Sequence, residues 1–363
     1  MAYRSALILT LVLASSSAFA GWTVSTFSAP NSDFTYILCN SEGKQAGGAI
    51  IGGQEHAGVW SGSSASWVDL NPTGSTYSTA MDISGNQEVG YAMFANHTFH
   101  AGFWTGSAES WVDLNPAGFT SSFGYGAWNG QQVGYAHDGY NCFASMWSGT
   151  ADSWVNLNPP GYYSSSASGI SDGQIVGKAS RSYDEAGHAG YWTGTAESWV
   201  DIHPDGYADS EAYDASDGWQ VGQATAIGDH WHAGMWHGTA ESWVDLNPEG
   251  SIRSEAYGIL AGKQLGFVYG PVTGNQYHAA MWSGTAESWF DLHSLLSPDY
   301  DSSDCRQLEI VGDDMWIGGA AINTAGRDVA ILWHYTPDAV PEPSSLVVLG
   351  TGLLALPFLR RKS

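Results

Sequence analysis

The feature that most constrains the fold is a Trp-rich phrase that returns at a nearly constant interval. Residues 100–116 read HAGFWTGSAESWVDLNP, and close copies occur four more times. The Trp of the HAGFW part falls at positions 60, 104, 147, 192, 236, 282 and 333, so the intervals are 44, 43, 45, 44, 46 and 51 residues. A fixed interval in this range is typical of repeat architectures whose unit is one supersecondary element. We therefore interpret the phrase as a building unit of the fold.

Each unit contains four short runs with β character. In one unit the first run lies around Met81 to Ser84 and the second around Glu88 to Ala92, and the HAGFW and SWVDL segments supply the third and fourth. Gly, Asn, Asp and Pro turn signals separate the runs, and side chains alternate between two faces along each run. Four strands in about 44 residues predict one blade of a β-propeller.

The number of runs predicts how the ring closes. The third run occurs seven times, but the fourth occurs only six times, because the last unit ends near Trp333. The segment from Trp22 to Phe27 resembles a fourth run that has no unit of its own. We predict an all-β, seven-bladed β-propeller over residues 21–337, in which this N-terminal strand completes the last blade. Closure also removes the free sheet edges of an open array.

The repeat resembles the HAF family of extracellular repeats. The matching letters are His-Ala-x-x-Trp-x-Gly, then Asp-Leu-x-Pro-x-Gly, then Ile-x-x-x-Gly-Gln-x-Val-Gly, and they recur over nearly all of residues 22–335. A Trp-Val pair before the Asp-Leu departs from the family pattern. The family is named from its sequence, so the resemblance implies no particular activity.

The first twenty residues predict an export signal. Arg4 supplies a positive start, an apolar run follows, and Ala18-Phe19-Ala20 is a small-x-small cleavage site. Cleavage between Ala20 and Gly21 would release the mature chain.

The last residues form a second targeting segment, 338–363. Val340-Pro341-Glu342-Pro343 precedes an apolar run from Leu346 to Leu359, and Arg360-Arg361-Lys362 follows. The run is shorter than the roughly 20 residues of a full membrane span, and the basic cluster would stay cytoplasmic. This order resembles a PEP-CTERM sorting signal, with Pro341, Glu342 and Pro343 as its motif. The resemblance implies a bacterial surface protein that an exosortase-type enzyme handles, in an organism that makes exopolysaccharide, with a transient or retained anchor in the inner membrane.

The composition narrows the class of partner. The formal net charge is -25, and such an acidic surface repels phosphate backbones, which excludes nucleic acid as a partner. Only 13% of residues are charged, whereas Gly and Trp are abundant, so the chain is a packed β protein and not a disordered acidic tail. Cys39, Cys142 and Cys305 are too few for a disulfide framework and have no metal-ligand spacing.

Most recurring residues favour structural roles. A Trp that every blade requires at one place favours packing between neighbouring sheets. The recurring His of the third run is replaced by Phe143 and Val329 in two units, so we expect it to be packed and hydrogen-bonded instead of binding a metal. The Asp of the fourth run is replaced by Asn156 in one unit, which suits a cap on backbone N–H groups better than acid–base catalysis.

Residues that break the repeat are the better candidates for a site. Trp128, Trp219 and Trp316 fall at or beside the turn between the first and second runs of three blades. The loops between the third and fourth runs share that face and carry a series of acidic residues: Glu109, Asp152, Glu197, Glu241 and Glu287. Aromatic rings with carboxylates suit stacking on sugars, or a glycan contact that Ca²⁺ assists, although no cofactor is required. Solvated turns with aromatic packing are the alternative.

The sequence therefore favours a non-enzymatic exported protein of the cell surface or biofilm matrix that binds exopolysaccharide. A propeller-fold sugar hydrolase or lyase is an alternative, which would need carboxylates clustered at the axis. Its candidates are Asp172, Asp217, Asp313 and Asp314, although Asp-Gly turns explain the first two. A protein-interaction platform is a third possibility.

The predicted tryptophan face has a direct test. Replacement of Trp128, Trp219 and Trp316 by Ala in residues 21–337 should abolish retention on envelope polysaccharide, because stacking on the indole rings would be lost. Retention is measured with Ca²⁺ and with chelator, and circular dichroism checks that the fold is intact. Undiminished retention would return the three residues to a packing role.

Overall fold

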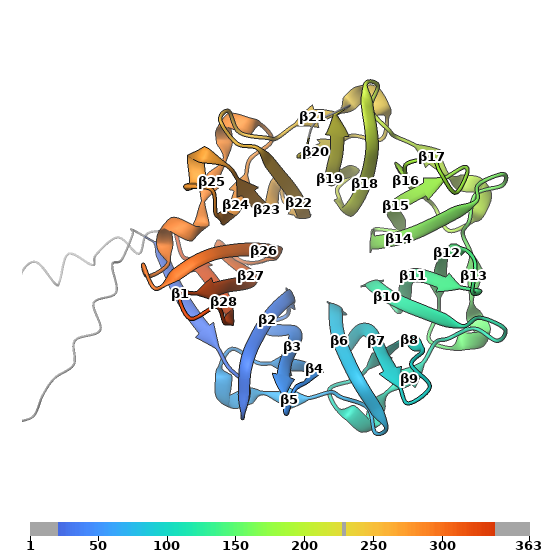
Figure 1. Ribbon diagram of the computed structural model, residues 1–363, viewed down its shortest axis with the longest axis horizontal. Helices are drawn as coiled ribbons and strands as arrows, with labels where there is room; N and C mark the ends of the chain where they lie inside the picture. The colour runs from blue at the N-terminus through green and yellow to red at the C-terminus, as the bar shows by residue number, and fades with distance from the viewer. Residues whose placement is uncertain (1–20, 227–229, 338–363) are drawn as a thin grey trace, which may run out of the picture.

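The computed structural model describes residues 21–226 and 230–337. Seven four-stranded antiparallel sheets surround a central axis as the blades of a propeller (Figure 1). The predicted all-β, seven-bladed architecture is confirmed. The predicted export signal up to Ala20 and the predicted sorting segment with Pro341, Glu342 and Pro343 lie outside the described residues.

In blades one to six the strands follow one another in chain order from the axis outward. Blades one and two consist of β2 (Ser32–Ser41), β3 (Lys44–Ile51), β4 (Gln54–Trp60), β5 (Val68–Asp69), β6 (Ser75–Ser84), β7 (Gln87–Phe94), β8 (Phe99–Trp104) and β9 (Val112–Asp113). Blades three and four consist of β10 (Ser121–Trp128), β11 (Gln131–His137), β12 (Cys142–Trp147), β13 (Val155–Asn156), β14 (Ser164–Ser171), β15 (Gln174–Ser180), β16 (His188–Trp192) and β17 (Val200–Asp201). Blades five and six consist of β18 (Tyr207–Ser216), β19 (Trp219–Ala226), β20 (Trp231–Trp236), β21 (Val244–Asp245), β22 (Arg253–Leu260), β23 (Lys263–Tyr269), β24 (Tyr277–Trp282) and β25 (Phe290–Asp291).

Blade seven is built from both ends of the domain. Its inner strands are β26 (Tyr300–Val311), β27 (Asp314–Asn323) and β28 (Asp328–Tyr335), and its outermost strand is β1 (Trp22–Phe27). β1 pairs antiparallel with β28 along its whole length, and Figure 1 shows the blue β1 beside the red β28. The predicted closure of the ring by the N-terminal strand is confirmed.

The fourth strands of blades one to six are shorter than predicted. Each contains only two residues, and a single 3-10 turn precedes it at the position of the Ser or Glu of the repeated phrase. These turns are η1 (Ser64–Ser66), η2 (Ala108–Ser110), η3 (Ala151–Ser153), η4 (Ala196–Ser198), η5 (Ala240–Ser242) and η7 (Ala286–Ser288). Two further turns, η6 (Pro271–Thr273) and η8 (Leu292–Leu295), occur only in blade six.

The register of β1 corrects one detail of the prediction. In blade two Val112 pairs with Phe103, so Trp111 stands opposite Trp104. In blade seven the residue opposite Trp333 is Val24. Trp22 is therefore not a copy of the repeated fourth-run Trp, because it precedes the corresponding position, Val24, by two residues along β1. Its ring packs instead against Phe290 and Tyr335, with centroids 5.8 and 5.1 Å away.

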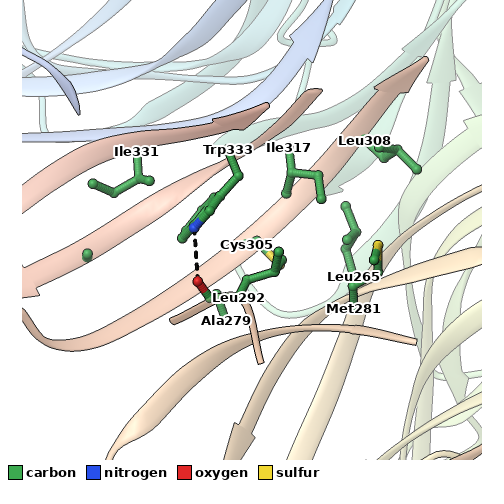
Figure 2. Packing of buried hydrophobic residues seen from close by; sticks show 10 residues of the cluster. Leu265, Ala279, Met281, Leu292, Cys305, Leu308, Ile317, Ile331 and Trp333 are labelled. Atoms are coloured by element: carbon green, nitrogen blue, oxygen red, sulfur yellow. Dashed lines mark hydrogen bonds between the residues drawn. The ribbon is translucent and has the colours of Figure 1, made fainter. Parts of the chain in front are cut away.

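The hydrophobic core consists of seven clusters, one at each junction between neighbouring blades. Every third-strand Trp is completely buried in one of them: Trp60, Trp104, Trp147, Trp192, Trp236, Trp282 and Trp333. Figure 2 shows the junction of blades six and seven, where the Trp333 indole N–H donates to the carbonyl oxygen of Leu292 at 3.1 Å. The predicted packing role of this Trp is confirmed.

A buried hydrogen bond accompanies each Trp at the junctions. The backbone N–H of a third-strand Ala donates to a hydroxyl on the first strand of the next blade, as from Ala57 to Ser78 at 3.0 Å. The bond from Ala330 to Thr35, at 3.1 Å, joins blade seven to blade one in the same way. Because a buried N–H without a partner is costly, this Ser or Thr is required in every blade.

The recurring His and Asp of the repeat bind one another. In five blades the His Nδ1 lies 2.6 to 2.9 Å from an oxygen of the fourth-strand Asp, in the pairs His56–Asp69, His100–Asp113, His188–Asp201, His232–Asp245 and His278–Asp291. The other oxygen of each Asp accepts a backbone N–H two or three residues later. The predicted cap and the predicted hydrogen-bonded His are confirmed, and the partnership between them is new.

The fourth-strand Trp requires a small residue on the third strand. A Cβ on Gly58 would overlap the ring of Trp67, and the same holds for Gly234 and Trp243. In blade seven, where Val24 takes the place of this Trp, the third-strand residue opposite the pocket is Ile331. A large ring with Gly and a small side chain with Ile therefore fill the same space.

This exchange of volume predicts that one substitution compensates for the loss of stability caused by the other. Gly58→Ile should lower the free energy of unfolding by about 1–3 kcal/mol or more, because the new side chain overlaps Trp67. Trp67→Val should also destabilise, because it leaves a cavity. The double variant, which copies the Ile331 and Val24 pair, should recover part of the loss in denaturant unfolding. Strictly additive losses would contradict the volume exchange.

Candidate ligand-binding channel

Each blade lines the central axis with one residue that the sheet leaves unpaired. The pairing of first and second strands skips a position in the inner part of the first strand in all seven blades, which marks a β-bulge, and four blades skip a second position near the start of that strand. A bulge turns a side chain out of the regular alternation of the sheet. The residues skipped at the bulge that all seven blades share are Leu38, Met81, Tyr125, Ser168, Tyr213, Tyr257 and Arg306, and all seven line one axial cavity of about 920 Å³.

The bulge residue is Tyr in three blades and Leu, Met, Ser or Arg in the other four, whereas the positions around it are more uniform. The residue before the bulge is small or aliphatic in every blade and is buried where it forms the junction, as are Ala80, Ala167 and Ala256. Packing dictates the flanking positions but leaves the bulge position free. The channel wall is therefore the part of the blade that can vary without loss of the fold.

The residue after each bulge decides how the inner strands of neighbouring blades meet. Asp82 accepts the backbone N–H of Ala127 at 2.8 Å, and Asp214 accepts that of Ile259 at 3.0 Å. Gln307 accepts the N–H of Asn40 in the same way at 3.1 Å. Three other blades have Gly at this position, and a Cβ on Gly258 would overlap the carbonyl oxygen of Arg306. Polar caps and glycines thus close the wall between blades.

Two carboxyl groups of this wall have strongly perturbed acidity. Burial raises the pKa of Asp82 to about 7, although hydrogen bonds from Ala127 and Ile83 act in the opposite direction. Burial likewise raises the pKa of Asp214 to about 6. Both side chains line the channel, yet they lie deep in the protein. Both carboxyl groups can therefore gain or lose a proton near neutral pH.

Charge pairs occupy two other parts of the wall. Lys178 binds Glu211 at 2.7 Å, and the Ser168 hydroxyl donates to the other oxygen of that carboxylate at 3.2 Å. The Arg306 guanidinium binds Asp304 at 3.1 Å and lies over the Tyr257 ring, 3.8 Å from its centroid. The channel therefore presents tyrosine rings beside both acceptors and donors of hydrogen bonds.

A second cavity of about 590 Å³ adjoins the first, and Leu38, Met81 and Arg306 line both. Its other walls include Tyr36 and Thr79, which precede the bulges of their strands. The turns after the first strands, such as that at Gly85, line only the larger cavity. The second cavity thus lies toward the face opposite those turns, and we call it the tyrosine cavity.

The three predicted ligand tryptophans do not share one cavity. Trp128 ends β10 and lines the axial channel. Trp219 packs on the His237 ring, with centroids 4.6 Å apart, and Trp316 stacks on His334 at 3.5 Å. All three stand at the turns between first and second strands, as predicted, but Trp219 and Trp316 do not line either cavity.

The predicted carboxylates are also distributed around the ring. Glu109, Asp152, Glu197, Glu241 and Glu287 each lie in the 3-10 turn of a different blade. Asp172 and Asp217 are turn residues with positive φ, which agrees with the Asp-Gly turn interpretation. Asp314 lies 3.1 Å from His334, and neither it nor Asp313 lines a cavity. Sequence analysis missed carboxylates of the axial wall, including Asp82, Asp214 and Glu211.

The described residues hold no group of three or more His, Cys, Asp or Glu side chains arranged to bind a metal ion. Cys39, Cys142 and Cys305 are free thiols, and the first and third are buried. Within residues 21–226 and 230–337 no helix is long and apolar enough to span a membrane.

The raised pKa values of Asp82 and Asp214 predict a pH-dependent stability. Both pKa values in the folded state lie above the value of about 3.9 in the unfolded chain. At pH values between these two limits the folded state therefore binds more protons than the unfolded state. The contribution of these two groups to the free energy of unfolding is fully present below about pH 4, and it is lost as the pH rises through about 6 to 7. Asp82→Asn or Asp214→Asn should each reduce this fall in urea unfolding between pH 4.5 and 8. An equal reduction in Glu249→Gln, at an exposed site, would contradict the assignment.

Comparisons with known proteins identify the end of the chain and the fold. A puromycin hydrolase in complex with PGG aligns at 10% identity and a TM-score of 0.53, over 84% of this chain and 55% of its own. A puromycin-hydrolyzing peptidase of Mycobacterium tuberculosis aligns at 12% identity and a TM-score of 0.52, over 85% and 54%. The chain thus spans about half the length of these structures, and at such identity the likeness concerns the fold alone.

No curated protein matches the chain in sequence. The family model described as the PEP-CTERM protein-sorting motif matches residues 339–363. That match does not extend to the repeats, so their resemblance to the HAF family stays a prediction. The chain carries a C-terminal PEP-CTERM sorting motif, which indicates an exported protein that an exosortase-type sorting enzyme recognises.

Proposed function

We propose that this exported protein is a non-enzymatic component of the cell surface or biofilm matrix that binds an exopolysaccharide in its axial channel. One observation carries the proposal: seven bulge residues of five different types line an axial cavity inside a frame that otherwise repeats. Packing explains the repeated residues, but it does not explain why the channel wall carries Tyr in three blades and Leu, Met, Ser or Arg in the other four.

The chemistry of the wall supports a sugar as the ligand. Tyr125, Tyr213 and Tyr257 offer ring faces and hydroxyl groups, and Glu211 and Arg306 offer an acceptor and a donor. Apolar ring faces stack on the C–H face of a sugar while polar groups bind its hydroxyls. Trp128 stands at the turn end of the same channel, so it remains a proposed ligand residue. Trp219 and Trp316 have weaker support because they pack on histidine rings.

A second candidate function is a sugar hydrolase or lyase. The observation in its favour is that Asp82 and Asp214, whose pKa values burial raises to about 7 and about 6, line the channel. A protonated carboxyl group near neutral pH suits a general acid. Each carboxylate nevertheless accepts two backbone N–H groups, which supports a capping role. New reducing ends or unsaturated products that disappear in Asp82→Asn and Asp214→Asn would favour the enzyme.

The binding proposal predicts a loss of affinity in channel variants. Tyr125→Ala and Tyr213→Ala should each weaken binding to native envelope polysaccharide by about tenfold, because each removes one stacking surface. The measurement is a glycan-array and polysaccharide binding screen on the purified chain, with Ca²⁺ and with chelator.

Tyr140→Ala and Tyr183→Ala provide matched controls, because these side chains are 88% and 82% exposed outside the channel. They should bind as the natural protein does. Equal loss in channel and control variants would contradict an axial site. Absence of any glycan binding, together with capture of a defined protein partner, would favour an interaction platform instead.

A further inference from the structure

The tyrosine cavity has walls unlike those of the rest of the channel. Aromatic rings of blades one, two and six surround it: Tyr36, Tyr77, Tyr91, Phe267 and Tyr277. Tyr77 and Tyr91 stack at 6.1 Å, and Phe267 meets Tyr277 edge to face at 5.0 Å. These contacts fix the orientation of the rings, so the wall is already formed without a ligand. Its volume of about 590 Å³ lies in the range of small-ligand pockets.

The charges that line this cavity are unbalanced. Glu55, Asp304 and Asp328 are acidic, whereas Arg306 is the single basic residue of the lining. Arg306 is engaged by Asp304, and Glu55 accepts a hydrogen bond from the Tyr36 hydroxyl. Burial raises the pKa of Asp328, and the neighbouring Asp304 carboxylate raises it further. A positively charged ligand would relieve this repulsion.

Cations already contact tyrosine rings in and near this cavity, namely Tyr277 of its wall, Tyr269, and Tyr257 of the axial channel. The Arg253 guanidinium lies 4.9 Å from the ring centroids of both Tyr269 and Tyr277. Arg306 lies over Tyr257 at 3.8 Å. Electron-rich ring faces attract ammonium and guanidinium groups, and the attraction grows where water is excluded. Aromatic walls with uncompensated carboxylates therefore suit an organic ammonium group better than a neutral or anionic one.

We propose that the tyrosine cavity binds sugar units with a free amino group, with the ammonium held by Glu55 and Asp328 and the ring stacked on the tyrosines. This inference rests on the proposed polysaccharide function and names its ligand class. An N-acetylated unit has no charge to offset the carboxylates, and a uronic acid would add to the repulsion. The cavity therefore discriminates between deacetylated and acetylated segments of one polymer.

The test compares three tetrasaccharides of equal length on the full chain by titration calorimetry: β-1,4-linked glucosamine, its N-acetylated form and the glucose tetramer. The glucosamine tetramer should bind at least tenfold more tightly than the other two. Glu55→Gln and Asp328→Asn should each reduce that preference by about tenfold. Gln at position 55 still accepts from Tyr36, so the local hydrogen bond survives.

The acidity of the chain requires a matched control, because a net charge of -25 attracts any polycation. Asp301→Asn removes the same charge from an exposed site on blade seven outside the cavity, and it should keep the full preference. An equal loss in Asp301→Asn would overturn the site as non-specific attraction.

The remaining outcomes separate this inference from the proposed function. Equal binding of all three tetramers would overturn the amine preference and leave polysaccharide binding intact. Binding of glucosamine alone that depends on Asp328, without retention of any polysaccharide, would support the ammonium site but overturn its polymeric ligand. Absence of binding in every titration would overturn the inference, and the channel variants would then decide the proposed function separately.

Discussion

The structure depends on the burial of one Trp between each pair of neighbouring blades. Full burial of such a side chain removes a large apolar surface from water, and the chain repeats this at all seven junctions. The hydrogen bond from a third-strand Ala to a Ser or Thr of the next blade fixes the same junction in register. Because each blade shares a buried cluster with both of its neighbours, closure of the ring adds the seventh junction, between blades seven and one.

The repeat made the architecture predictable, because its interval and its missing fourth strand correspond to a blade count and a closure. The predicted roles of Trp, His and Asp also follow from exchanges inside the ring, such as His to Phe143 and Asp to Asn156. The register of Trp22 was not predictable, because the loop after β1 is shorter than the loops after the other fourth strands. The presence of a Trp at position 22 also suggested that it corresponds to the fourth-run Trp of the other blades, which is wrong. Only pairing with β28 shows that Val24 stands opposite Trp333.

The channel was missed for a physical reason. A bulge adds one residue that neither the alternation of a strand nor the packing of a junction constrains. The residue type at that position therefore follows no pattern that sequence analysis could recognise. In residues 79–84 (TAMDIS) and 166–171 (SASGIS), Met81 and Ser168 occupy the bulge position. Variation at one position between conserved neighbours of the repeat was the available signal. Sequence analysis instead favoured the tryptophans that fall outside the repeat as ligand residues. Two of them, Trp219 and Trp316, pack on histidine rings and line neither cavity.

Closure by β1 also determines how the domain responds to pulling. β28 lies between β1 and β27, so hydrogen bonds hold it on both sides, and Trp333 anchors it in the junction with blade six. The sorting motif follows directly along the chain. A force applied through that end would shear two ladders at once instead of peeling an edge strand. The strand order thus places a strand that is held on both sides, and not an edge strand, next to the sorting motif.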